Sequence, residues 1–314
     1  MNIVLVGAGS HSSIHHGPSI QHYVRQHPGA IHALVCDLSL EKATRAQERF
    51  GFERAFHSLD ELFAQVTVDA AISVLPFDRM MPVIHAFTER RIPLAIEKPL
   101  GADLEAARRI VRVVEESGSP VMVSLNRRFD PALLRAKEWI AGIGPVRYVH
   151  GAILRHGRTD PGFVWGTAVH LLDAMVAAAG PLTVSPQGAV LVNGPGGCGR
   201  AGRLEGLDGV VGTFEILPAC GRVEEYLRLA GDGWCVDLWT GTPHPWKVQA
   251  WCGGKPVMDE AAPADQPEFI RNGAYNETAA FIDAALARVS PPAPSPLDAL
   301  VATELADRLQ RLTF

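Results

Sequence analysis

Two short segments carry residue types that could take part in chemistry. One is the turn from Gly7 to Ser12, which directly follows the apolar run Ile3 to Val6. The other is the charged pair Glu97 and Lys98, which ends the apolar run Leu94 to Ile96. A lysine at a strand end can hydrogen-bond to a carbinol oxygen, or protonate it, during hydride transfer. A salt-bridged strand end is the plain alternative for the charged pair.

The turn fits the dinucleotide-binding fingerprint, in which a glycine-rich loop joins a strand to a helix. Gly7 permits the tight turn, and Gly9 lets the backbone approach the pyrophosphate of the cofactor. Ser12 stands at the third glycine position, where a small side chain still allows the helix to lie close to the strand. The turn therefore predicts a dinucleotide site.

An acidic residue after the second predicted strand supports NAD as the cofactor. Asp37 lies about 25 residues beyond Ser12, where a carboxylate can accept hydrogen bonds from the ribose hydroxyls of NAD. Leu38 offers no positive charge to a 2′-phosphate, although Lys42 and Arg45 could reach back, so NADP stays open. The predicted cofactor contacts are Gly7, Ala8, Gly9, Ser10, His11, Ser12, Asp37, Leu75, Pro76, Glu97 and Lys98.

Strand-like and helix-like segments alternate over residues 1–124. The elements that these segments form must position the predicted cofactor contacts. This alternation predicts an α/β Rossmann domain with a doubly wound parallel sheet, in which ligands bind at the carboxyl ends of the strands. Glu97 and Lys98 would then face the cofactor. The predicted strands are Ile3 to Val6, Ile31 to Cys36, Ala70 to Leu75, Leu94 to Ile96 and Val121 to Ser124.

Residues 125–314 show a different pattern, with two helices followed mainly by strands. Successive strands favour an α+β domain with an open, mostly antiparallel sheet. The glycine-rich segment Asn193 to Gly209 is predicted as a flexible loop. A proline-rich connector precedes the last helix, 297–312, which could pack back near the domain junction.

The composition is that of a globular protein, with 47% apolar residues, 20% charged residues and a formal charge of -5. We expect no nucleic-acid partner, no membrane span and no secretory signal, and hence a cytoplasmic protein. The five cysteines form no CxxC pair and are expected to be free thiols. His11, His15 and His16 crowd together, but zinc sites usually add carboxylate or thiolate ligands, so no metal site is predicted.

The sequence resembles the glucose-fructose oxidoreductase/inositol dehydrogenase (Gfo/Idh/MocA) family along nearly the whole chain. The resemblance rests on GAGSHSSIH at the start, AIEKPLG, NRRFDP from Asn126 to Pro131, AVHLLDAM and YNETAAFIDA. It implies that Lys98 is catalytic, and that His15 is the family's histidine three residues past the third glycine position. It further implies an NAD(P)-dependent oxidoreductase acting on a CH–OH group of a sugar, polyol or related small molecule. It also implies that residues 125–314 bind substrate and mediate oligomerisation, giving a homodimer or homotetramer.

The resemblance also implies an acid/base residue in the second domain. His170 and Asp173 match two family positions and share one helix face, whereas Gly166 stands where the family usually carries an aspartate. His170 could act as the acid/base because its usual pKa lies near working pH, with a structural histidine as the alternative. At a second position the family often shows Thr-Pro-Asn, where this chain has Leu75-Pro76-Phe77. The expected substrate contacts are Lys98, Asn126, Arg128, His170 and Asp173.

Two other functions remain open on the same fold. Some relatives bind the cofactor and act as regulatory sensors without turnover, and the loss of an aspartate at Gly166 would suit such a role. Others use NAD transiently to cleave glycosidic bonds. The presence of both Lys98 and His170 argues against the sensor.

Overall fold

The computed structural model describes residues 1–194 and 197–312, which form two compact units. The first unit comprises Met1–Leu125 and Ala274–Leu300, and the second Asn126–Gly273 and Val301–Phe314. The boundary after Leu125 lies one residue beyond the predicted boundary, which follows residue 124. Residues 274–300, in contrast, were assigned to the second domain by the sequence but have their contacts in the first unit.

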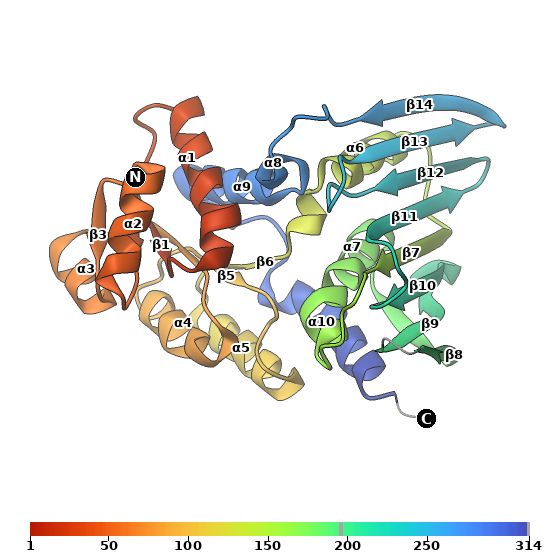
Figure 1. The fold of residues 1–314 in the computed structure, drawn as a ribbon, viewed down its shortest axis with the longest axis horizontal. Coiled ribbons are helices and arrows are strands. Elements are labelled where there is room, and N and C mark those ends of the chain that lie inside the picture. Colours follow the sequence, from red (N-terminus) through yellow and green to blue (C-terminus); the bar gives the residue numbers. More distant parts are fainter. Residues whose placement is uncertain (195–196, 313–314) are drawn as a thin grey trace. The chain divides into compact units, whose positions relative to one another are not determined.

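The first unit is built on a six-stranded parallel sheet with the order β3-β2-β1-β4-β5-β6 (Figure 1). The order reverses beside β1, which pairs with β2 on one side and with β4 on the other. This is the doubly wound arrangement that the sequence predicted, with β3 added. The strands are β1 (Asn2–Val6), β2 (His32–Cys36), β3 (Arg54–Phe56), β4 (Ala70–Ser73), β5 (Leu94–Glu97) and β6 (Val121–Ser124).

Helices cover both faces of this sheet, with α1, α2 and α9 above it and α4 and α5 below it in Figure 1. Side chains cap the first turns of α3 and α5: Ser58 accepts from the Glu61 amide, and Asp103 from the Ala106 amide at 2.8 Å. The helices are α1 (Gly17–Gln26), α2 (Leu40–Phe50), α3 (Leu59–Gln65), α4 (Met80–Thr88), α5 (Leu104–Ser117) and α9 (Ala274–Ala287).

Buried polar contacts explain why α9 belongs to the first unit. The Tyr23 hydroxyl of α1 donates to Asp283 Oδ1 of α9 at 2.5 Å. At the end of β6, the Ser124 hydroxyl donates to Glu277 Oε2 at 2.7 Å, and Glu277 is 1% exposed. Such long-range contacts leave no trace in the local pattern of the sequence.

The second unit contains an eight-stranded sheet with the order β14-β13-β12-β11-β7-β10-β9-β8. Only β7 and β10 pair in parallel, which confirms the predicted mostly antiparallel sheet. The strands are β7 (Tyr148–Leu154), β8 (Leu182–Gly194), β9 (Gly197–Gly206), β10 (Val211–Leu217), β11 (Glu224–Gly231), β12 (Trp234–Trp239), β13 (Lys247–Cys252) and β14 (Lys255–Ala261).

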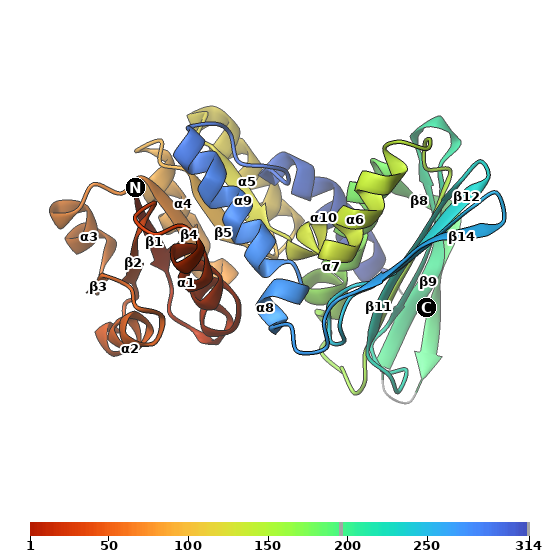
Figure 2. The ribbon, with the colours of Figure 1, turned by 90° about the horizontal axis from the view of Figure 1, so that it is seen from above.

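Helices α6 (Pro131–Ile140) and α7 (Val169–Ala179) lie on one face of this sheet (Figure 2). The opposite face carries no helix of the second unit among the described residues. The described residues also include α8 (Glu268–Arg271) and α10 (Pro296–Gln310), and the boundary between the units falls within α10. Every helix in residues 1–194 and 197–312 is too short or too polar to cross a bilayer.

The predicted loop from Asn193 to Gly209 is wrong for most of its length. Strand β9 occupies this segment and pairs with both β8 and β10. Its glycines allow close approach of the strands, because a Cβ at Gly202 would lie 1.9 Å from the Gly188 carbonyl oxygen. Residues 195–196 of the predicted loop lie outside the described residues.

Candidate functional site

The glycine turn lies at the carboxyl end of β1, as the fingerprint requires. Gly7 has a φ of 96°, and a Cβ there would lie 2.4 Å from the Val74 carbonyl oxygen, so only glycine fits. The Ser12 hydroxyl donates to the Gly7 carbonyl oxygen at 2.6 Å. The serine at the third glycine position therefore ties the start of the following helix to the turn.

Asp37 follows β2 and is fixed by two backbone donors. Its Oδ2 accepts from the Ala8 amide at 2.7 Å, and its Oδ1 accepts from the Ser39 amide at 2.8 Å. These bonds place the carboxylate at the wall of a cavity of about 960 Å³, which Lys42 also lines. Leu38 beside it is 76% exposed. Each carboxylate oxygen can accept further bonds, so Asp37 can still bind a ribose hydroxyl.

A second cavity of about 300 Å³ joins the glycine turn to the ends of β4 and β5. Gly9, Leu75 and Pro76 line both cavities. The structure thus brings predicted cofactor residues from four strand ends to one edge of the sheet. The second cavity is lined by Gly9, Ser10, His11, Val74, Leu75, Pro76, Glu97 and Lys98.

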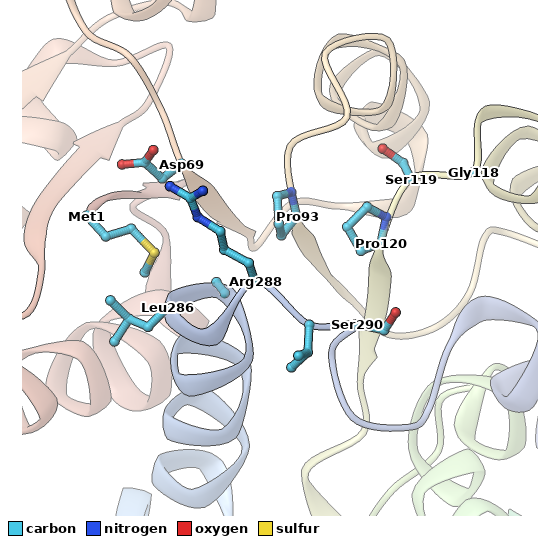
Figure 3. Close-up of a pocket in the computed structure, with 11 residues that line it drawn as sticks. Met1, Asp69, Pro93, Gly118, Ser119, Pro120, Leu286, Arg288 and Ser290 are labelled. Carbon is cyan, nitrogen blue, oxygen red and sulfur yellow. The ribbon is translucent and has the colours of Figure 1, made fainter.

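A third cavity, of about 760 Å³, lies at the opposite edge of the same sheet (Figure 3). Met1, Asp69, Pro93 and Pro120 line it, and each directly precedes a strand of the sheet. Ligands of open α/β sheets bind at the carboxyl ends of the strands, so this cavity is not the cofactor site.

Glu97 is buried at the end of β5 and is bound by two imidazoles. Its Oε1 lies 2.8 Å from His16 Nε2 and 3.1 Å from His11 Nε2, and its Oε2 accepts from the Lys98 amide at 3.1 Å. Burial alone would raise the pKa of Glu97, but the hydrogen bonds and charges of both histidines hold it well below its usual range. The carboxylate is therefore ionised beside Lys98.

In the second unit, α7 places His170 and Asp173 in the interior, with His170 8% exposed. Both oxygens of Asp173 accept from Arg128, Oδ2 from Nε and Oδ1 from Nη2, each at 2.8 Å. The Asp173 side chain has no exposed surface. Two predicted substrate contacts thus bind each other. Asn126, another predicted contact, donates from Nδ2 to the Asn272 carbonyl oxygen at 2.9 Å.

The sequence did not single out Glu225 of β11, a buried carboxylate that accepts hydrogen bonds from three side chains. Its two oxygens accept from Arg127 at 2.7 and 2.8 Å, Oε1 also accepts from Arg155, and Thr240 donates at 3.2 Å. Burial would raise the pKa of Glu225, but the charges of Arg127 and Arg155 lower it strongly, and His170 contributes in the same direction. A signal exists in the strand pattern, because Glu225 alternates with buried Leu227 and Leu229.

Asp130, whose charge interacts with that of Glu225, has a pKa shifted in the opposite direction. Burial raises its pKa to about 7, against the hydrogen bonds it accepts from the Gly241 and Ala132 amides. The charge of Arg127 lowers this pKa and the charge of Glu225 raises it, and burial outweighs the lowering contributions. At neutral pH Glu225 is therefore ionised, whereas Asp130 titrates in that range.

A family model described as an oxidoreductase family with an NAD-binding Rossmann fold matches residues 1–125. An inositol 2-dehydrogenase of Saccharopolyspora erythraea is 30% identical over 240 residues, which are 70% of this chain and 68% of that protein. The chain belongs to the Gfo/Idh/MocA family of oxidoreductases. This confirms the predicted family, the predicted class of enzyme and NAD as the cofactor.

A further similar protein matches over less of its length. An uncharacterized protein of Saccharomyces cerevisiae is 28% identical over 168 residues, which are 51% of this chain and 44% of that protein. A solved oxidoreductase from Agrobacterium radiobacter, in complex with NAD⁺, L-tartaric acid and magnesium, superimposes with a TM-score of 0.79 at 18% identity. That superposition covers 98% of this chain and 94% of the other and bears on the fold.

The turn Ser12–His16 is π-helical, and at its end His16 Nε2 lies 2.8 Å from Glu97 Oε1. A departure of this Gfo/Idh/MocA chain from the family pattern lies in the second unit. At Gly166, where the family usually has an aspartate, a Cβ would meet no atom within 4 Å. The position therefore has room for a side chain that the sequence does not supply.

Proposed function

We propose that this chain catalyses reversible hydride transfer between NAD and the carbinol carbon of a sugar, polyol or related small molecule. One observation carries the proposal: Gly9, Asp37, Leu75, Pro76 and Lys98 converge on two adjoining cavities at the carboxyl edge of the parallel sheet. NAD, when bound there, would supply the hydride-accepting or hydride-donating carbon. The name of the Saccharopolyspora relative makes a cyclic polyol the first substrate class to test.

We assign roles in the reaction to residues of each unit separately. The glycine turn would hold the pyrophosphate with backbone amides, and Asp37 would bind the ribose. Lys98 would hydrogen-bond to the carbinol oxygen and carry its proton, with His170 as acid/base. Arg128 and Asp173, which bind each other, would orient the helix that carries His170 rather than bind substrate.

The experiment follows the absorbance of reduced nicotinamide while the purified chain is incubated with NAD or NADP and a panel of sugars and polyols. Lys98→Ala is expected to lower turnover at least about 100-fold, because general acid/base groups contribute that much or more. Lys255→Ala, at an exposed position of β14, is the matched control and should leave turnover unchanged. Turnover that survives Lys98→Ala overturns the mechanism.

The regulatory alternative has its own support in Gly166. Tight NAD binding without turnover on any substrate would favour it, and Gly166→Asp, which the open space admits, should then bring turnover back. Release of a sugar from a glycoside without net NADH would select the glycosidase-like alternative.

We further propose that the open face of the second unit's sheet joins two copies of the chain. Tyr148, His150, Tyr226 and Arg228 alternate along β7 and β11 with buried residues and so point away from the helices. Aromatic residues and arginine are enriched in protein interfaces. Light scattering of the purified chain would show a dimer or tetramer, and Tyr226→Glu would shift it to the monomer.

A further inference from the structure

The fold brings to the crowded histidines the carboxylate that the local sequence lacks. His11 and His16 come from the turn after β1, and Glu97 comes from the end of β5, 81 residues beyond His16. One ligand atom from each of the three side chains lies within 4.8 Å of the ligand atoms of the other two. Two imidazoles and one carboxylate form the ligand set of open zinc sites, which keep a fourth position for water or a ligand.

The spacing of the three atoms suits a small divalent cation. Bonds of about 2.0–2.2 Å in tetrahedral geometry put neighbouring ligand atoms about 3.3 Å apart. The observed separations from Glu97 Oε1 are 2.8 Å to His16 and 3.1 Å to His11. The side chain of His11 is 47% exposed, so its ring can turn by the small amount required, while Glu97 and His16 are held in the interior.

A cation can also reach this cluster. His11 and Glu97 line the 300 Å³ cavity, so the fourth position would open into it. His16 Nδ1 is buried and has no hydrogen-bond partner among the described residues. Coordination through Nε2 requires the ring proton of His16 to lie on Nδ1. Because Nδ1 has no partner among the described residues, moving the proton there breaks no existing hydrogen bond at Nδ1.

We propose that His11, His16 and Glu97 form a binding site for a first-row divalent transition cation, with Zn²⁺ as the best fit. Imidazole and carboxylate ligands suit zinc and cobalt and exclude magnesium and calcium, which prefer oxygen alone. The positive charge of Lys98 in the same cavity weakens the site, which favours reversible over permanent occupation.

A cation at this site would inhibit the binding of NAD. This step rests on the proposed function, because it requires the dinucleotide to use the cavity that His11 and Lys98 line. The cation occupies the wall of that cavity and draws His11 toward Glu97. We therefore expect Zn²⁺ to raise the Kd for NAD.

Cobalt binding tests the site without any catalytic readout. The full chain, treated with a chelator and dialysed, is titrated with Co²⁺, and intense visible absorption typical of tetrahedral cobalt is expected, reversed by Zn²⁺. His11→Ala should weaken binding at least about 100-fold, since even outer-shell changes cost about 10–100-fold. His15→Ala is the matched control, because its ring contacts His11 at a centroid distance of 4.5 Å but lies outside the cluster.

Two results would overturn the site: the absence of this absorption, or equal Co²⁺ affinity in the chain and in His11→Ala. His11 is half-exposed, so His11→Ala should fold, which circular dichroism checks. The inhibition is tested separately by NAD titration with and without Zn²⁺. An unchanged Kd for NAD in the presence of bound Zn²⁺ overturns the inhibition, whereas a chain that binds Co²⁺ but never NAD overturns the proposed function alone.

Discussion

Glu97 in the first unit and Glu225 in the second are both buried glutamates with a lowered pKa, but their partners differ in kind. Glu97 is compensated by two imidazoles, which can lose a proton or exchange it for a metal ion. Glu225 is compensated by two guanidinium groups, which stay charged at every pH the protein tolerates. Glu97 thus belongs to a site whose compensating charges can change. The charges that compensate Glu225, which we call the scaffold carboxylate, are fixed.

The largest expected effect is the loss of the scaffold carboxylate. Glu225→Gln leaves the buried guanidinium groups of Arg127 and Arg155 without a counter-charge, which should lower the free energy of unfolding by about 3–5 kcal/mol. Urea unfolding at neutral pH measures it. Glu105→Gln, in the exposed pair with Arg109, is the matched control, with an expected change below about 1 kcal/mol.

The pH dependence of this effect has a defined sign. The folded-state pKa of Glu225 lies below the unfolded value of 4.5, so its contribution is present above about pH 4.5 and is lost as the pH falls further. The difference in stability between the chain and Glu225→Gln should therefore shrink in acid. A difference that stays constant down to pH 3 would contradict the scaffold role.

Asp130 should show the opposite pH dependence. Its pKa rises from 3.8 in the unfolded chain to about 7 in the fold, so the folded state holds a proton that the unfolded state has released. Stability is therefore lost as the pH rises from about 4 to 7, by up to about 4 kcal/mol, since each pKa unit corresponds to about 1.4 kcal/mol. Asp130→Asn should flatten the plot of the free energy of unfolding, measured with urea, against pH across this window. An unchanged slope of that plot would refute the assignment.

The smallest expected effect lies at Glu97. Glu97→Gln removes a buried charge whose partners can become neutral, so we expect a loss of about 1–3 kcal/mol, less than at Glu225. The same urea experiment at neutral pH compares the two substitutions directly. An equal or larger loss at Glu97 would show that its histidines act as fixed charges and would remove the distinction between the two sites.

The parts of the molecule that were predictable are those encoded locally. Apolar runs and the glycine turn from Gly7 to Ser12 predict the parallel sheet and the cofactor edge, because the fingerprint depends on neighbours in sequence. The pairing of Glu97 with His16 joins residues 81 positions apart, and the turn Ser12–His16 that carries His16 is π-helical. Neither can be read from spacing. The contact of Arg127 with Glu225, 98 residues away, is equally invisible locally.

The strands of the second unit show the same limit. The alternation that predicts β10 and β11 is strong, but glycines in Gly197–Gly206 suggested a loop, because their role in close strand approach depends on the neighbouring strand. Residues 274–300 were likewise assigned by their order in the chain, whereas Tyr23 and Ser124 decide where α9 packs.

The discontinuity of the first unit bears on the order in which the chain can fold during synthesis. Domains generally fold as units as they leave the ribosome, starting from the N-terminus. Here the parallel sheet is translated first, but α9, which covers the hydroxyls of Tyr23 and Ser124, is among the last segments made. The second unit's sheet is translated in between. The nucleotide-binding half is thus begun first and can be completed only near the end of translation.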